Sequence, residues 1–263
     1  MDLGLRNRKA IVQAASRGLG RAAAEVLASE GCDLAICSRT EADIEAVAKD
    51  LRSRFGTKVA AFACDVSADA SLHRFFEHSL ASLGGVDILV TNNGGPSPGG
   101  MDTLTDRDWD KAAELLLMSV VRSCRHVLPV MKQQYRGRII NVTSVSVKQP
   151  LPNMMLSNTM RAAVAGFSKS LAQEVAPCGI LVHCVMPGSF MTDRNRELGA
   201  RVMADRGISE EQLLREWTGQ VPLGRMGDPL EFGRLVAFLA SDACSYTTGS
   251  CIPIEGGQIR SLA

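Results

Sequence analysis

Three polar side chains in the second half of the chain could together stabilise a negative charge that develops on an oxygen atom. Ser144 ends the strand-like run 138–143, and Ser157 and Arg161 lie four residues apart in a helical pattern. Residues i and i+4 of a helix share one face, so the Ser157 hydroxyl and the Arg161 guanidinium are expected to point the same way. Two hydroxyls and a guanidinium are donors suited to an oxyanion site.

Other titratable side chains near these residues are few. Lys148 follows Ser144 by four residues, in a loop expected to line a ligand crevice, where it could donate a proton or be a solvated loop lysine. His183 lies in a strand-like run, and a packed strand histidine is favoured over a base. The only tyrosines are Tyr135, in a turn before the strand that Ser144 ends and so at its opposite end, and Tyr246, near the end of the chain.

A glycine-rich turn near the beginning of the chain could bind a cofactor that carries phosphates. The first strand-like run leads into Ala14-Ala15-Ser16-Arg17-Gly18-Leu19-Gly20 and then into a helical pattern. Glycines in such a turn let the backbone approach a pyrophosphate, which the N–H groups at the helix N-terminus then face. An acidic residue at the end of the second strand would select NAD(H), but Arg39 stands there. Arg39 and Arg17 could instead hold a 2′-phosphate, which favours NADP(H) over the alternative of two surface charges.

These residues lie on strand-like and helix-like segments that alternate along the chain. The strands are expected at 9–13, 33–37, 58–63, 87–91, 137–143, 180–185 and 250–254, and the helices at 19–30, 41–55, 70–83, 106–132, 157–175 and 229–239. The strands are continuously apolar, as strands covered on both faces are. The alternation predicts an α/β fold: a single doubly wound, Rossmann-type domain with a mainly parallel seven-stranded sheet and helices on both faces. Helix starts are signalled by Ser67 and by Asp228-Pro229.

We expect residues 1–263 to form one dinucleotide-binding and catalytic domain. The polar segment 192–220 interrupts the alternation, and a capped helix is expected to begin at Ser209. An insertion after the carboxyl end of a strand overhangs the ligand crevice, so this segment is predicted to be a substrate lid, the alternative being a surface excursion. An apolar pocket wall, or alternatively core, is predicted for Met154, Met155, Leu156, Phe190 and Met191.

The composition argues against several other classes of protein. The formal net charge is only +1, so strong attraction to nucleic acid or to a membrane surface is not expected. No apolar run reaches the length of a membrane span, and no secretory signal is seen, which predicts a cytoplasmic protein. The eight cysteines form no CxxC pair, so we expect buried reduced thiols and no metal site.

Several motifs resemble, in order and along nearly the whole chain, those of the short-chain dehydrogenase/reductase family, above all its β-ketoacyl-carrier-protein-reductase-like members. They are Gly18 and Gly20 in the glycine turn, Asp65-Val66, Asn92-Asn93-Gly94-Gly95, Pro187-Gly188-Ser189-Phe190-Met191-Thr192 and Glu255-Gly256-Gly257. The resemblance implies cofactor-binding roles for Ser16, Arg17, Gly18, Leu19, Gly20, Arg39, Asp65, Val66, Asn92, Gly94, Arg161, Pro187, Gly188 and Thr192. The family's Thr-Gly before the turn is replaced by Gln13-Ala14, and alanine is costly there only if its φ is positive.

The resemblance also implies a catalytic Asn, Ser, Tyr and Lys, and this chain departs from that set. The four positions align with Leu116, Ser144, Ser157 and Arg161. A serine hydroxyl is a poor acid and an arginine does not usefully deprotonate. Arg161 could brace the nicotinamide ribose or bind a substrate carboxylate with its planar fork. The resemblance further implies a homotetramer that packs through the helices near 106–132 and 157–175.

Three functions remain open at this point. The first, which we favour, is an NADP(H)-dependent reductase of carbonyl or hydroxyl substrates, similar to 3-oxoacyl reductases, in which Ser144 orients the substrate oxygen, Arg161 supplies charge and water or Lys148 supplies the proton. The second is a dinucleotide-binding protein without redox activity. The third is a lyase or isomerase that uses Ser144, Ser157 and Arg161 as an oxyanion site. The nucleotide motifs support the first two, and the missing tyrosine supports the last two.

Overall fold

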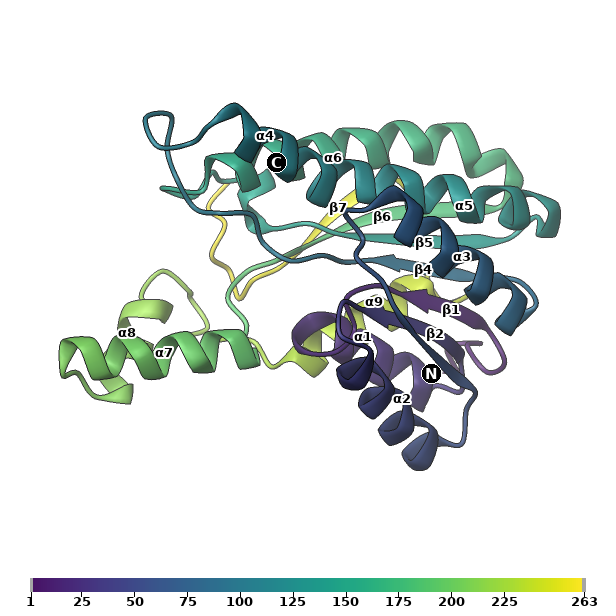
Figure 1. Cartoon of the computed structure of the whole chain (residues 1–263), viewed down its shortest axis with the longest axis horizontal. Coiled ribbons are helices and arrows are strands. Elements are labelled where there is room, and N and C mark those ends of the chain that lie inside the picture. Colours follow the sequence, from purple (N-terminus) through teal and green to yellow (C-terminus); the bar gives the residue numbers. More distant parts are fainter. Residues whose placement is uncertain (1, 262–263) are drawn as a thin grey trace.

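The computed structural model describes residues 2–261, and in it seven strands form one parallel sheet (Figure 1). The order across the sheet is β3-β2-β1-β4-β5-β6-β7. The strands are β1 (Lys9–Val12), β2 (Asp33–Ser38), β3 (Val59–Ala63), β4 (Ile88–Thr91), β5 (Gly137–Val142), β6 (Ile180–Pro187) and β7 (Ser250–Ile254). The predicted doubly wound α/β fold is confirmed. The predicted single domain includes residues 1, 262 and 263, which lie outside the described residues.

Helices cover both faces of the sheet (Figure 1). On one face lie α1 (Gly18–Ser29), α2 (Glu41–Phe55) and α9 (Pro229–Ala240), and on the other α3 (Asp69–Leu83), α5 (Ser119–Gln134) and α6 (Met155–Val175). Each layer buries an apolar cluster against the sheet, because alternate residues of a strand point to opposite faces. In β1, Ala10 and Val12 face α1 and Ile11 faces the other layer.

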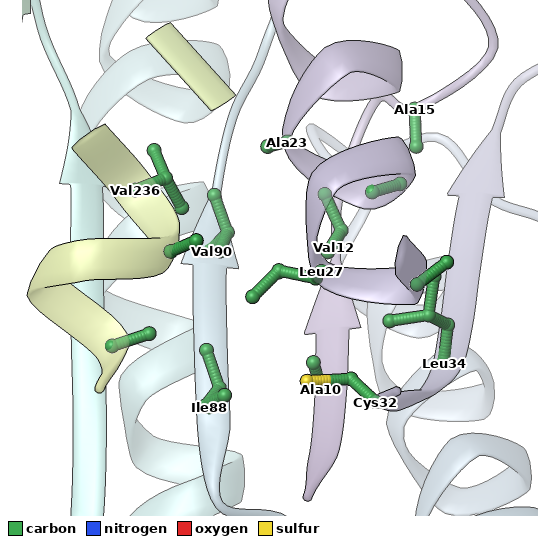
Figure 2. Packing of buried hydrophobic residues seen from close by; sticks show 14 of the residues in the cluster. Ala10, Val12, Ala15, Ala23, Leu27, Cys32, Leu34, Ile88, Val90 and Val236 are labelled. Carbon is green, nitrogen blue, oxygen red and sulfur yellow. The ribbon is translucent and has the colours of Figure 1, made fainter. Parts of the chain in front are cut away.

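The first of these clusters joins the two halves of the sheet (Figure 2). Val12 of β1 and Val90 of β4 lie beside Leu27 of α1 and Val236 of α9. The helices α1 and α9 approach closely, since a Cβ added to Gly233 would lie 2.5 Å from the carbonyl oxygen of Ala22. This packing fixes the start of α1, where the glycine turn lies, relative to β4.

Two of the three predicted helix starts are confirmed. Ser209 caps α8 (Glu210–Thr218) and Asp228 caps α9, each in a capping box that satisfies backbone N–H groups at the helix start. The expected cap at Ser67 is wrong. The residue before α3 is Ala68, and the Ser67 hydroxyl instead donates to the Asp65 carboxylate over 2.7 Å.

The single helix expected at 106–132 is divided into three segments. They are α4 (Asp106–Ala112), a π-helical segment at Ala113–Met118 and α5. A π-helix widens the turn by one residue, and apolar residues at helical spacing do not reveal it. Leu116 lies in this segment and is buried.

The segment predicted as a lid contains two helices, of which α7 (Asp193–Arg206) was not expected. Helices α7 and α8 extend from the body of the molecule (Figure 1). They pack on each other through Gly199 of α7, where an added Cβ would come within 3.0 Å of Leu213 and 3.2 Å of Trp217, both on α8. No helix within residues 2–261 is long and apolar enough to cross a membrane.

Candidate active site

A large cleft opens along the carboxyl ends of the strands, with a volume of about 1820 Å³. Its lining includes residues that follow β1 and β4, which are neighbours in the sheet although they are separated in sequence. Ligands of open α/β sheets bind at such a switch in strand order. The volume exceeds the roughly 300–1,000 Å³ of most small-ligand pockets, so the cleft has room for a dinucleotide together with a substrate.

The glycine turn forms one end of this cleft, and its backbone is tightly constrained. Gly18 has φ +58°, and a Cβ on Gly20 would lie 2.3 Å from the Ala14 carbonyl oxygen and 2.7 Å from the Asn92 amide nitrogen. Gly20 therefore allows α1 to approach β1 and β4, and it does not itself line the cleft. Ala14 has φ +49°, a conformation that L-residues with a Cβ rarely adopt. Ala14 therefore has the positive φ that is costly for an alanine.

Arg17, within this turn, and Arg39, which follows β2, both line the cleft, and both are exposed. Arg17 lies 3.8 Å from Glu197 of α7, an exposed ion pair that contributes little to stability. Within residues 2–261, no carboxylate lies within 4 Å of the Arg39 guanidinium. Both side chains are therefore available to a phosphate.

The loop after β6 lies near the middle of the cleft. Pro187, Gly188 and Thr192 line it, as the motif predicts. A Cβ on Gly188 would lie 2.6 Å from that of Glu255, so the two motifs contact each other across β6 and β7. The Thr192 hydroxyl accepts a hydrogen bond from the Asn195 N–H and caps α7.

Ser157 and Arg161 meet in the cleft, as their spacing predicts. The Arg161 Nε–H donates to the Ser157 Oγ over 3.2 Å. One terminal nitrogen of Arg161 donates to the carbonyl oxygens of Val142 and Thr143, at 3.2 and 3.1 Å, and the other has only a long contact of 3.5 Å with Asn93. The guanidinium is therefore fixed between the end of β5 and the loop after β4.

The charge of Arg161 has no acidic counterpart. Within the described part of the chain, no carboxylate lies within 4 Å of its guanidinium. Burial lowers the pKa of Arg161 to about 10, so the group remains a cation at neutral pH. Arg161 is partly buried, a partly buried cation without a partner is unfavourable, and an anionic group of a ligand would relieve that cost.

The two serines beside Arg161 can act as hydrogen-bond donors. Ser144 caps a short 3₁₀ turn, Val145–Val147, and its Oγ accepts from the Ser146 N–H over 3.1 Å. The Ser157 Oγ accepts from Arg161. In both cases the hydroxyl hydrogen has no acceptor among residues 2–261. The site thus offers two hydroxyl donors and a cation to one ligand oxygen or to two adjacent oxygens.

Most predicted site residues come together in this cleft. Those that line it are Ser16, Arg17, Gly18, Leu19, Arg39, Asp65, Val66, Asn92, Gly94, Ser144, Ser157, Arg161, Pro187, Gly188 and Thr192.

Lys148 is not among the residues that line the cleft. Cys251 lies in the edge strand β7, and its pKa is lowered to about 7. The main cause is a hydrogen bond with Cys184, and the charge of Lys148 adds a weaker effect, so Lys148 lies near β7. Among the residues predicted to form an apolar pocket wall or, alternatively, core, Met154 lines the cleft, whereas Leu156 and Phe190 are buried core residues.

The other predicted alternatives concern residues outside the cleft. Tyr135 and Tyr246 are exposed and do not line it. His183 is buried in β6, where burial lowers its pKa, in agreement with a packed strand histidine.

One wall of the cleft was not anticipated from the sequence. It is formed by α4 and the π-helical segment, with Asp110, Lys111, Glu114 and Leu115 in the lining. The segment expected to overhang the crevice contributes a further wall through α7, but its lining residues, Asp193, Glu197, Leu198 and Arg201, carry no motif that would single them out.

Comparison with known proteins identifies the family. Residues 13–258 match a family model described as enoyl-(acyl carrier protein) reductase. The chain belongs to the short-chain dehydrogenase/reductase family. It is 32% identical over 258 residues to the 3-oxoacyl-acyl-carrier-protein reductase FabG of Aquifex aeolicus, covering 98% of this chain and 100% of the relative.

Two solved structures of the family are especially informative. L-sorbose reductase of Gluconobacter frateurii, complexed with NADPH and L-sorbose, has a TM-score of 0.97, 32% identity and full coverage of both chains. An NADPH-bound short-chain oxidoreductase of Pseudomonas aeruginosa, described as containing an atypical catalytic centre, has a TM-score of 0.89 and 32% identity, covering 98% of this chain and all of its own.

Proposed function

We propose that this protein is an NADP(H)-dependent reductase of carbonyl substrates, similar to 3-oxoacyl reductases, with a non-standard active site. The contact between Arg161 and Ser157 in the cleft carries this proposal, because it puts a cation and a hydroxyl where the family has its phenol and ammonium. The NADPH-bound relatives support the choice of cofactor.

The residues of this chain fit NADP(H). Ser16, Gly18 and Leu19 of the glycine turn line the cleft at the start of α1, where a pyrophosphate would face the N–H groups of the helix N-terminus. Arg39 and Arg17 would hold the 2′-phosphate. Bound in this cleft, NADPH supplies a hydride to the substrate carbon.

The proposed mechanism assigns the remaining steps to this chain. Ser144 and Ser157 donate hydrogen bonds to the substrate carbonyl oxygen, and Arg161 stabilises the negative charge that grows on it during reduction. Water supplies the proton to that oxygen, because neither serine is acidic and Lys148 lies outside the cleft lining. Without a positioned acid we expect turnover about 10²–10⁴-fold below that of enzymes that have one.

Residues 192–220 are proposed to act as a lid. Helix α7 carries Asp193, Glu197, Leu198 and Arg201 on the wall of the cleft. Movement of α7 and α8 would then control access of substrate to Ser144 and Ser157.

Calorimetric titration with NADPH and NADH, followed by assay on a panel of ketones, tests the proposal. NADPH should bind more tightly than NADH, and Arg39→Ala should weaken NADPH binding by about 10–100-fold, as expected for hydrogen bonds to a charged group, while NADH binding changes little. Arg234→Ala, which removes an exposed arginine of α9 outside the cleft, is the matched control.

The titration and the assay separate the alternatives. Equal affinity for the two cofactors would refute the assigned role of Arg39. Tight NADPH binding without reduction of any ketone would favour a dinucleotide-binding protein without redox activity. Conversion of a substrate without change in NADPH would favour a lyase or isomerase.

A further inference from the structure

We infer that the substrate of this cleft is an oxo acid, with a carboxylate one or two carbons from the reacting carbonyl, and that Arg161 recognises that carboxylate beside the carbonyl oxygen that Ser157 binds. The inference rests on the proposed function in one respect, since it takes the reacting carbonyl to lie beside Ser144 and Ser157. It adds the chemical class of the substrate, which neither the relatives nor the fold supply.

The first argument is the hydrogen bonding of the guanidinium. Two of the three nitrogens of Arg161 are occupied by protein acceptors at 3.1 to 3.2 Å. The third has one protein contact, to Asn93 at 3.5 Å, which is too long to be a strong hydrogen bond. At least one of its two N–H groups is therefore left for a ligand, and the other contacts fix its direction.

The second argument is charge. Of the other arginines that line the cleft, Arg17 lies 3.8 Å from Glu197, Arg21 lies 3.4 Å from Asp50, and Arg39 and Arg201 are exposed to solvent. Arg161 is only partly exposed, has no carboxylate within 4 Å among the described residues, and loses part of its hydration to burial. An uncharged ketone would leave that cation unpaired after binding, whereas a carboxylate would pair with it.

The third argument is spacing. The Ser157 Oγ and the Arg161 Nε are 3.2 Å apart, so the groups that the hydroxyl and the guanidinium bind must also be neighbours in the ligand. A carbonyl oxygen and a carboxylate oxygen are neighbours of this kind in 2-oxo and 3-oxo carboxylates. A longer acid, with its carboxylate further along the chain, would not reach both groups.

Binding of a hydroxy acid to the NADPH-saturated protein tests the inference without turnover, because the two reduced partners cannot react. Calorimetry with 3-hydroxybutanoate and with its methyl ester isolates the carboxylate. The acid should bind at least about tenfold more tightly than the ester, the lower end expected of a hydrogen-bonded charge. Arg161→Gln should remove this preference, and Arg234→Gln should leave it unchanged.

A second variant covers the case in which Arg161→Gln does not fold. Arg161→Lys keeps a positive charge and loses the planar fork, so the preference for the acid should fall by several-fold and not vanish. Equal binding of acid and ester by the wild type, or no binding of either, would overturn the inference. So would an Arg161→Gln protein that keeps the preference and loses only NADPH affinity, because Arg161 would then serve the nicotinamide ribose.

The carboxylate site and the proposed reductase activity can be confirmed or refuted separately. An acid preference without any NADPH-dependent reduction would sustain the carboxylate site and refute the reductase. Reduction of oxo acids and their esters at equal kcat/KM would do the opposite.

Discussion

Ser157 and Arg161 hold the positions at which the family's tyrosine and lysine are expected, and they differ from that pair in acidity and shape. A serine does not release a proton near neutral pH, and the planar fork of arginine does not reproduce the compact contact of an ammonium. In this protein the guanidinium is fixed by two backbone carbonyls in addition to Ser157. The guanidinium is therefore held in one orientation by α6 and the end of β5.

Restoring the phenol and the ammonium should restore the usual chemistry. The double change Ser157→Tyr with Arg161→Lys should raise NADPH-dependent reduction of simple activated ketones, by up to the roughly 10²–10⁴-fold that a positioned acid provides. Ser157→Tyr alone should do less. Initial rates with an uncharged ketone measure the effect, and circular dichroism checks that each variant is folded.

The opposite result would be equally informative. A wild type with ordinary turnover that the double change abolishes would mean that Ser157 and Arg161 are the working groups of another mechanism. If Arg161 binds a carboxylate, as inferred above, the double change should also impair reduction of oxo acids while it improves that of simple ketones.

Ala14 carries backbone strain at the cofactor end of the cleft. Its φ of +49° costs an L-residue with a Cβ roughly 1–2 kcal/mol, which a glycine would not incur. Ala14→Gly should raise the unfolding free energy by up to about 1 kcal/mol, because the relief of strain exceeds the extra entropy that glycine gives the unfolded chain. The same change should tighten NADPH binding. Denaturant unfolding and calorimetry measure the two effects.

The neighbouring alanine provides the control for this change. Ala15 is fully buried and its φ is not positive, so Ala15→Gly should only destabilise. Equal loss of stability in both variants would show that the Ala14 conformation is not strained in solution.

At the scale of elements, the strands could be predicted to within about two residues at each end, because their apolar runs are continuous, as in strands buried on both faces, although the edge strands β3 and β7 are partly exposed. The π-helical segment Ala113–Met118 could not be predicted, since its leucines and methionine fit an ordinary helix equally well. Helix α7 was missed for a related reason: its surface is polar and charged, so no apolar stripe marks it.

Strand β6 contains a buried titratable group with a consequence for acid stability. Burial lowers the pKa of His183, and the nearby charge of Arg138 adds to the effect, whereas a backbone contact at Thr247 opposes it. The unfolded chain, with an ordinary pKa of about 6.5, then binds the proton more readily than the folded protein. Stability should therefore fall as pH drops below about 6.5.

Removal of the imidazole should reduce this acid sensitivity. His183→Leu should lose less melting temperature between pH 7.5 and pH 5.5 than the wild type does, although some loss should remain because burial and His73 also lower the pKa of His126. His78→Gln, at an exposed position, is the control. An unchanged pH dependence in His183→Leu would show that this residue is not the source.

At the scale of the whole molecule, the position of the site could be predicted but its enclosure could not. The motifs after β1, β4, β5 and β6 converge because the carboxyl ends of parallel strands meet at one edge. The walls from α4 and α7 depend on how those helices pack, as Asp110 and Leu198 illustrate. The contacts of Arg161 with the carbonyls of Val142 and Thr143 likewise appear only once α6 lies against β5.

The outer surface of α5 and α6 supports the prediction of a homotetramer. Partly exposed apolar residues lie on both helices, among them Val130 and Phe167, and Gly166 of α6 has no atom near the position of an added Cβ. Gly166→Glu should therefore leave the fold intact and, if α6 packs on a copy of itself, divide the assembly. Gly166→Ala is the matched control.

Light scattering at micromolar concentration measures the mass of the assembly and so tests this prediction. The wild type and Gly166→Ala should have four times the mass of one chain, and Gly166→Glu should have less. A monomeric wild type would refute the tetramer.

The two tryptophans of the chain lie on two different helices, and neither is among the residues that line the cleft. Trp109 belongs to α4 and Trp217 to α8, where it contacts α7 at Gly199. Each indole thus reports on a different helical segment beside the site. Because the emission of indole overlaps the absorption of a reduced nicotinamide, this protein carries its own pair of optical probes: replacement of one tryptophan by phenylalanine would let the other report separately on ligand arrival and on movement of α7 and α8.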